Sequence, residues 1–209
     1  MDKKNMFFAG LDLGQRRDYT AIVVVERRDV MQAYQAPKFH SIAVRHVERM
    51  ALGTPYPAVV ARVREIVQSD ALRGNCSLTV DGTGVGIPVM HMLWSGQLGC
   101  EICAVTMTGG ERQHSRGATW VSVPKRDLIA GVQVLLEQGE LRIARDLRAA
   151  RMLLRELMDV QARTKSNGGV RIGADGYGEH DDLVIALALA CWKAKRRREL
   201  FGTQRLPGI

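Results

Sequence analysis

The sequence is short of cysteine, of aromatic residues and of long apolar runs. Only four of its 209 residues are cysteines, and no second Cys or His pair follows the C-x-x-C of Cys100 and Cys103. We therefore expect core thiols in a reducing cytoplasm, not a zinc site or a disulfide framework. With 5% aromatic residues, base stacking on single strands is not indicated. No apolar run approaches the roughly 20 residues that span a bilayer. The first apolar segment contains Asp12, so we expect no signal peptide.

Acidic residues are also few relative to basic ones. The chain has 22 Asp and Glu against 30 Lys and Arg, a net charge of +8 and a calculated pI of about 9.7. Such an excess fits a polyanionic partner. The length suits one large domain or two small ones. No linker or repeat is visible, so we expect one domain over 1–209, with a structured core over about 6–197 and a basic tail.

The apolar patterning predicts an α/β fold. Strands are expected at 6–13, 20–26, 39–47, 77–80, 100–107 and 141–143, and helices at 57–69, 87–94, 124–138 and 146–163. A mobile polar loop is expected at 108–119 and a hairpin within 164–178. The first three strands should pair antiparallel and the next ones parallel, giving a central mixed sheet flanked by helices.

Two adjacent acids, Asp181 and Asp182, precede an apolar helix expected from residue 183 to 192. This segment is apolar on all sides, which is typical of a buried helix, and three alanines at 186, 188 and 190 let it lie close to a sheet. The acids have two interpretations at this point. They cap the helix and complement its dipole, or they belong to a functional site at its entrance.

Two further acids, Asp12 in GLDLG and Asp81 in LTVDGTG, each end a predicted strand before a glycine. If the two strands are neighbours and the last helix crosses them, all four acids converge. Clustered carboxylates raise one another's pKa unless a cation neutralises them. Hard oxygen ligands favour Mg²⁺ or Mn²⁺. Two such ions activate a water and stabilise the leaving oxygen of a phosphodiester.

Three motifs occur in order along the chain: GLDLGQRRDYTA, LTVDGTGVG and EHDDLVIALALA. Together they resemble the nuclease domain of the large terminase subunit of tailed bacteriophages, over about residues 7–192. The resemblance implies a ribonuclease H-like fold and an Mg²⁺- or Mn²⁺-dependent endonuclease that uses two ions to cut double-stranded DNA during genome packaging. The partners it implies are DNA, the terminase ATPase domain, the small terminase subunit and the portal, in the cytoplasm of the host of a phage or prophage.

The resemblance also assigns roles to individual residues. Asp12 would bridge both ions, Asp81 would be the second ligand, and Asp182 would be the third. Asp181, the other candidate for the third ligand, would ligate through water or support the ligands without touching the ions, and His180 would orient a water or the phosphate. The candidate DNA-backbone contacts, chosen for their charge, are Arg16, Arg17, Arg112, Arg116, Lys165 and Arg171.

One departure from the family concerns ATP. A full large subunit carries an ATPase domain, and this sequence contains no G-x-x-x-x-G-K-[ST] motif. We therefore expect the nuclease part alone. Three alternatives remain at the level of the sequence: a dimeric Holliday-junction resolvase of the same fold, an actin-like or sugar-kinase-type nucleotide-binding protein, and a catalytically inactive DNA-binding module.

Overall fold

The computed structural model describes residues 6–14, 18–30, 39–84, 86–110, 112–115, 117, 119–164, 170–173 and 180–202. Their strands are β1 (Met6–Asp12), β2 (Ala21–Val30), β3 (Phe39–Arg49), β4 (Cys76–Asp81), β5 (Glu101–Thr108), β6 (His114–Ser115), β7 (Trp120–Pro124), β8 (Leu141–Ile143), β9 (Gln161–Thr164) and β10 (Val170–Gly173). Their helices are α1 (Tyr56–Val67), α2 (Gly86–Ser95), α3 (Lys125–Glu137), α4 (Ala150–Asp159) and α5 (Asp182–Gly202).

Eight of the described strands form one mixed sheet in the order β6-β7-β5-β4-β1-β2-β3-β8, and β9 and β10 form a separate hairpin. β1, β2 and β3 pair antiparallel, as predicted, and β4, β5 and β7 continue parallel to β1. β-branched residues dominate the central strands, for example in the AIVVV run that opens β2, because they pack well on a pleated surface that is covered on both sides. The predicted α/β architecture is confirmed.

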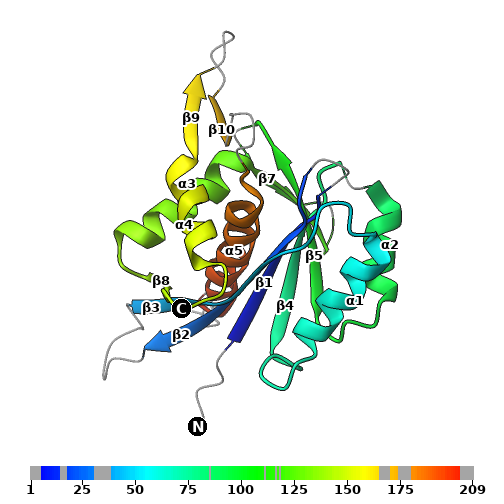
Figure 1. The fold of residues 1–209 in the computed structure, drawn as a ribbon. Coiled ribbons are helices and arrows are strands. Elements are labelled where there is room, and N and C mark those ends of the chain that lie inside the picture. Colours follow the sequence, from blue (N-terminus) through cyan, green and yellow to red (C-terminus); the bar gives the residue numbers. More distant parts are fainter. Residues whose placement is uncertain are drawn as a thin grey trace, which may run out of the picture.

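Helices cover both faces of the sheet (Figure 1), with α1 and α2 on one face and α3, α4 and α5 on the other. Two apolar clusters fill the layers between them. In α5, the residues from 182 to 191 are all buried. Successive side chains of β1 point to opposite faces of the sheet, so Phe8 lies in one cluster and Ala9 in the other.

α5 approaches the sheet closely at Gly10 of β1. A Cβ atom at this position would lie 1.9 Å from the carbonyl oxygen of Ala186 and 2.8 Å from the amide nitrogen of Ala190. Only glycine fits here, because any side chain would meet the α5 backbone at Ala186 and Ala190. The prediction that the alanines of this helix let it lie against a sheet is therefore confirmed.

Three predicted elements differ from the structure. The segment 108–119 was expected to be a loop, but it contains β6, and the sequence-based expectation missed β7 directly after it. The helix expected over 146–163 is limited to α4, and the chain beyond it pairs as β9 with β10, so the hairpin begins earlier than the expected 164–178. The last helix continues to Gly202, past the point where the basic tail was expected to lose structure. No helix in the described ranges is both long and apolar enough to cross a membrane.

Candidate active site

One edge of the sheet collects the ends of several strands. β1, β3, β4 and β7 all run in the same direction. Asp12 ends β1, Asp81 ends β4 and Arg49 ends β3, while Lys125 directly follows β7. α5 packs on β1 and β4 and begins with Asp182. Parallel strands that end together commonly border a ligand site in open α/β sheets.

Asp12 and Asp81 lie on adjacent parallel strands, since Leu11 is in register with Val80. Burial raises the pKa of Asp12 well above its usual value, and the carboxylates of Asp81, Asp182 and Asp181 raise it further, while Lys125 lowers it. Burial also raises the pKa of Asp81, although Thr83 donates its backbone N–H to Asp81 Oδ1 at 2.8 Å and opposes the shift. The charges of the other three acids thus act on Asp12, and β1 and β4 are neighbours, which the predicted convergence requires.

The two acids at the start of α5 have different cationic neighbours. Asp181 Oδ2 accepts a hydrogen bond of 2.7 Å from Lys125 Nζ. Asp182 is 6% exposed, and its Oδ2 lies 3.1 Å from Arg49 Nη2 and 4.0 Å from His180 Nδ1. Burial raises the pKa of Asp182, and Arg49 offsets part of the shift. The site therefore contains two positively charged side chains, those of Lys125 and Arg49, beside four carboxylates.

The amides in the first turn of α5 have a partner other than Asp181 and Asp182. The N–H groups of Leu183 and Val184 donate to Glu156 Oε2 of α4 at 2.9 and 3.4 Å. A residue from another helix thus performs the capping function that the sequence left open for the two adjacent acids. This arrangement favours the functional interpretation of Asp181 and Asp182.

The donor set suits a hard divalent cation. All four candidate ligands are carboxylates, their mutual repulsion raises the pKa of Asp12, and Asp182 Oδ2 is a buried atom without a hydrogen bond of good geometry. In the described part of the chain, no three His, Cys, Asp or Glu side chains are arranged so that they could together hold a metal ion. The residues therefore fit a metal by their chemistry, while Lys125 pairs with Asp181 and Arg49 pairs with Asp182.

Sequence reasoning missed four residues of this cluster: Lys125, Arg49, Glu156 and Tyr19. The Tyr19 ring packs edge-on against the His180 ring with centroids 4.9 Å apart, and the Arg49 guanidinium lies 4.9 Å above the Tyr19 ring. The strand-end rule that found Asp12 and Asp81 would also have found Arg49, and Lys125 once β7 was recognised. No sequence signal pointed to Glu156, because its partners lie on α5 and at the end of β3, far from it in the sequence.

Most of the predicted DNA contacts cannot be placed. Arg16, Arg17, Arg116 and Lys165 lie outside the described residues. Arg171 is in β10, where its backbone pairs with Arg163 of β9, and Arg112 is exposed between β5 and β6. Their role in DNA binding stays a prediction.

Solved structures with the same fold are nuclease domains of large terminases. The nuclease of the thermophilic phage G20c with bound magnesium is 22% identical, with a TM-score of 0.63 over 92% of this chain and 83% of that one. The nuclease domain of Thermus phage P74-26 is 20% identical, with a TM-score of 0.59 over 91% and 80%. That of bacteriophage SPP1 with bound Mn is 14% identical, with a TM-score of 0.53 over 91% and 88%.

No protein-family model and no curated protein matches this chain. At these identities the structural matches establish the fold alone. The chain has the ribonuclease H-like fold of terminase nuclease domains, as the three sequence motifs implied.

Proposed function

We propose that this chain is a DNA endonuclease of the terminase type, which hydrolyses phosphodiester bonds of double-stranded DNA with two Mg²⁺ or Mn²⁺ ions. The observation that carries the proposal is the cluster of Asp12, Asp81, Asp181 and Asp182 at one edge of this fold. The G20c nuclease has been solved with bound magnesium and cobalt, and the SPP1 domain with Mn. The same fold with a carboxylate cluster supports the same kind of cofactor here.

Asp12, Asp81 and Asp182 would hold the ions. Asp181 would either bind an ion or support the site through its hydrogen bond with Lys125. Bound divalent ions supply the positive charge that activates a water and stabilises the leaving oxygen. Lys125, 2.7 Å from Asp181, keeps a positive charge beside the site. His180 packs on Tyr19 and would orient a water or the scissile phosphate.

The substrate side of the proposal rests on charge. The net charge of +8 favours a polyanion held through its phosphates, which is a sequence-tolerant mode of binding. The partners proposed with this function are the terminase ATPase domain, the small terminase subunit and the portal, in the cytoplasm of a phage-infected or prophage-carrying cell.

Plasmid cleavage in Mn²⁺ tests the proposal. We expect the wild type to degrade supercoiled plasmid and linear duplex, and chelation to stop it. Asp12→Asn and Asp182→Asn should abolish cleavage and leave DNA binding in a gel-shift assay nearly intact, because the acids contact the ions and not the wider DNA surface. The exposed Asp127→Asn in α3 is the matched control and should cut normally.

Two results would redirect the assignment. Loss of cleavage in Asp181→Asn with full activity in Asp182→Asn would exchange the roles of these two acids. Cutting confined to four-way junctions by a stable dimer would favour a Holliday-junction resolvase. Binding of ATP without any cleavage would contradict the nuclease proposal outright.

A further inference from the structure

Glu156 is a buried acid that the proposed chemistry does not use. It lies on α4, inside the protein, and is 5% exposed. Its Oε2 accepts the two N–H groups of Leu183 and Val184, and its Oε1 pairs with Arg49 Nη2. A buried carboxylate is costly unless it is paired and hydrogen-bonded, and this one satisfies both oxygens. It therefore links α4, the end of β3 and the start of α5.

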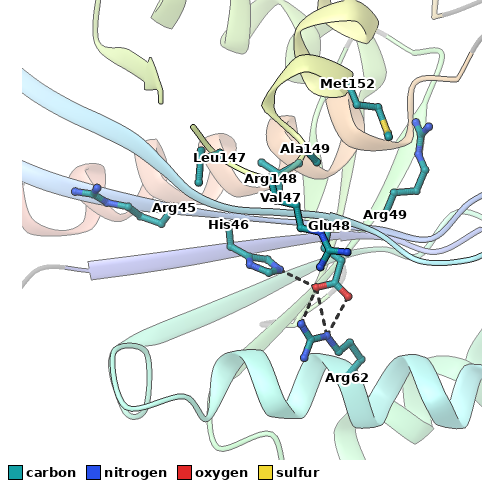
Figure 2. A pocket seen from close by; sticks show the side chains of 10 residues that line it. All are labelled: Arg45, His46, Val47, Glu48, Arg49, Arg62, Leu147, Arg148, Ala149 and Met152. Carbon is teal, nitrogen blue, oxygen red and sulfur yellow. Dashed lines mark hydrogen bonds and ion pairs between the residues drawn. The ribbon is translucent and has the colours of Figure 1, made fainter. Parts of the chain in front are cut away.

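Arg49 is shared between two acids. The same Nη2 atom that pairs with Glu156 lies 3.1 Å from Asp182 Oδ2, and the Arg49 side chain is 14% exposed. Figure 2 shows Arg49 on the side of β3 that faces α4, whereas Glu48 and His46 point to the opposite side, where Glu48 binds Arg62 of α1. Arg49 thus belongs to the layer that contains the candidate active site.

The net charge of Arg49, Glu156 and Asp182 together determines how strongly a cation is attracted to Asp182. One guanidinium faces two carboxylates, so the group formed by Arg49, Glu156 and Asp182 carries one net negative charge. Without the charge of Glu156, Arg49 would neutralise Asp182 alone and the net charge would be zero. An opposite charge within a few ångströms in a buried site interacts strongly. Glu156 therefore sets how firmly Arg49 holds Asp182.

We propose that Glu156 is a positioning residue for Asp182, which fixes the first turn of α5 and draws Arg49 away from full pairing with the Asp182 carboxylate. The proposal rests on the proposed function in one respect, namely that Asp182 binds a divalent cation. The anchoring of α5 by Glu156 does not depend on that function.

Three variants test the charge argument by calorimetric titration of the full chain with Mn²⁺. Glu156→Gln keeps the size of the side chain and one oxygen for the α5 amides but removes the charge, so Mn²⁺ affinity should fall about 10- to 100-fold, as for other residues that support metal ligands. Adding Arg49→Met should restore the affinity toward that of the wild type, because the double variant again carries one negative charge at Asp182. A purely structural role predicts no such rescue.

The matched control is Glu26→Gln. Glu26 is also a buried glutamate, 2% exposed, and it pairs with Arg28 and Arg45. It is in register with Phe7, at the other end of β1 from Asp12. This variant should lose stability yet bind Mn²⁺ as the wild type does. Equal affinities in Glu156→Gln and Glu26→Gln, or a double variant no better than Glu156→Gln, would overturn the proposal.

Amide hydrogen exchange in the metal-free protein separates the two proposals. Glu156→Ala should speed the exchange of Leu183 and Val184, whose N–H groups lose their acceptor, and Glu26→Ala should not. If the wild type binds no Mn²⁺ while this exchange result holds, the anchoring role stands and the proposed function fails. Unchanged exchange at both amides would refute the anchoring role.

Discussion

At the scale of single residues, the arrangement of the four aspartates lowers the stability of the folded protein. Asp12, Asp81 and Asp182 all have a raised pKa, chiefly because they are buried, and for Asp12 also because three other carboxylates face it. Such strain is common where residues are selected for function, since activity and stability compete. Lys125 and Arg49 relieve part of it by pairing with Asp181 and Asp182.

The pH dependence of stability should report this cost. A carboxyl whose pKa is higher in the folded than in the unfolded state binds more protons when folded, so its contribution to the free energy of unfolding falls as pH rises. The loss begins near the ordinary value of 3.8 and is complete above the raised folded pKa of each acid. Metal-free Asp12→Asn should therefore melt at a higher temperature than the wild type at neutral pH, with the difference vanishing in acid.

Differential scanning calorimetry in chelator across this pH range measures the difference directly. Comparing wild type with variant cancels groups such as Glu26 and Glu48, whose pKa values are lowered by arginine partners and have the opposite effect. Mn²⁺ should stabilise the wild type and not Asp12→Asn. A variant that is less stable than the wild type at neutral pH without metal would contradict this account of Asp12.

At the scale of elements, the contact between α5 and β1 places the acids. Gly10→Ala would put a Cβ atom 1.9 Å from the Ala186 oxygen, so α5 would have to shift away from the strand that carries Asp12. We expect a loss of about 3 kcal/mol or more, or roughly 6 °C or more in melting temperature for a chain of this length. Cleavage should fall as well, since Asp182 moves with α5.

Gly131→Ala is the control for this change. Gly131 lies within α3, and a Cβ atom there has no heavy atom within 4 Å. It should stabilise the protein by up to about 1 kcal/mol, because alanine favours a helix more than glycine does. If Gly10→Ala melted no lower than Gly131→Ala, the close docking of α5 on β1 would be wrong.

The limits of sequence reasoning are visible in particular elements. The central strands and α5 were predictable because burial on both sides leaves long apolar or β-branched runs, as in β2 and α5. β7 was missed because its five residues, WVSVP, follow a polar segment and include a proline. α4 was overextended because an arginine-rich amphipathic pattern continues into β9, which pairs with β10, and pairing with a distant strand overrides local preference.

The candidate site shows the same division. Asp12, Asp81, Asp181 and Asp182 carry local signals, since each lies at a strand end or a helix start. Glu156 carries no such signal, and the only local signal of Arg49 is its position at the end of β3. Their importance comes from contacts across 107 positions in sequence, which only the folded chain brings together.

At the scale of the whole molecule, the positive net charge of +8 predicts how DNA is held. When DNA is bound through its phosphates, the logarithm of the affinity falls linearly with the logarithm of the salt concentration. Such binding is nearly independent of the DNA sequence. We expect Asp12→Asn to bind duplexes of unrelated sequence equally well at each salt concentration. Fluorescence anisotropy with labelled duplexes measures this. A preference for one sequence that persists as salt rises would show direct base recognition instead.

The central claim is that Asp12, Asp81 and Asp182 bind divalent metal at the common edge of β1, β4 and α5. A crystal soaked in Mn²⁺ and examined by anomalous diffraction tests it most directly. The account predicts an anomalous peak within coordination distance of the Asp12 carboxylate and of Asp81 or Asp182, with Arg49 retained by Glu156. A fully soaked crystal with no peak at these carboxylates, or with Mn²⁺ bound only elsewhere, would contradict it.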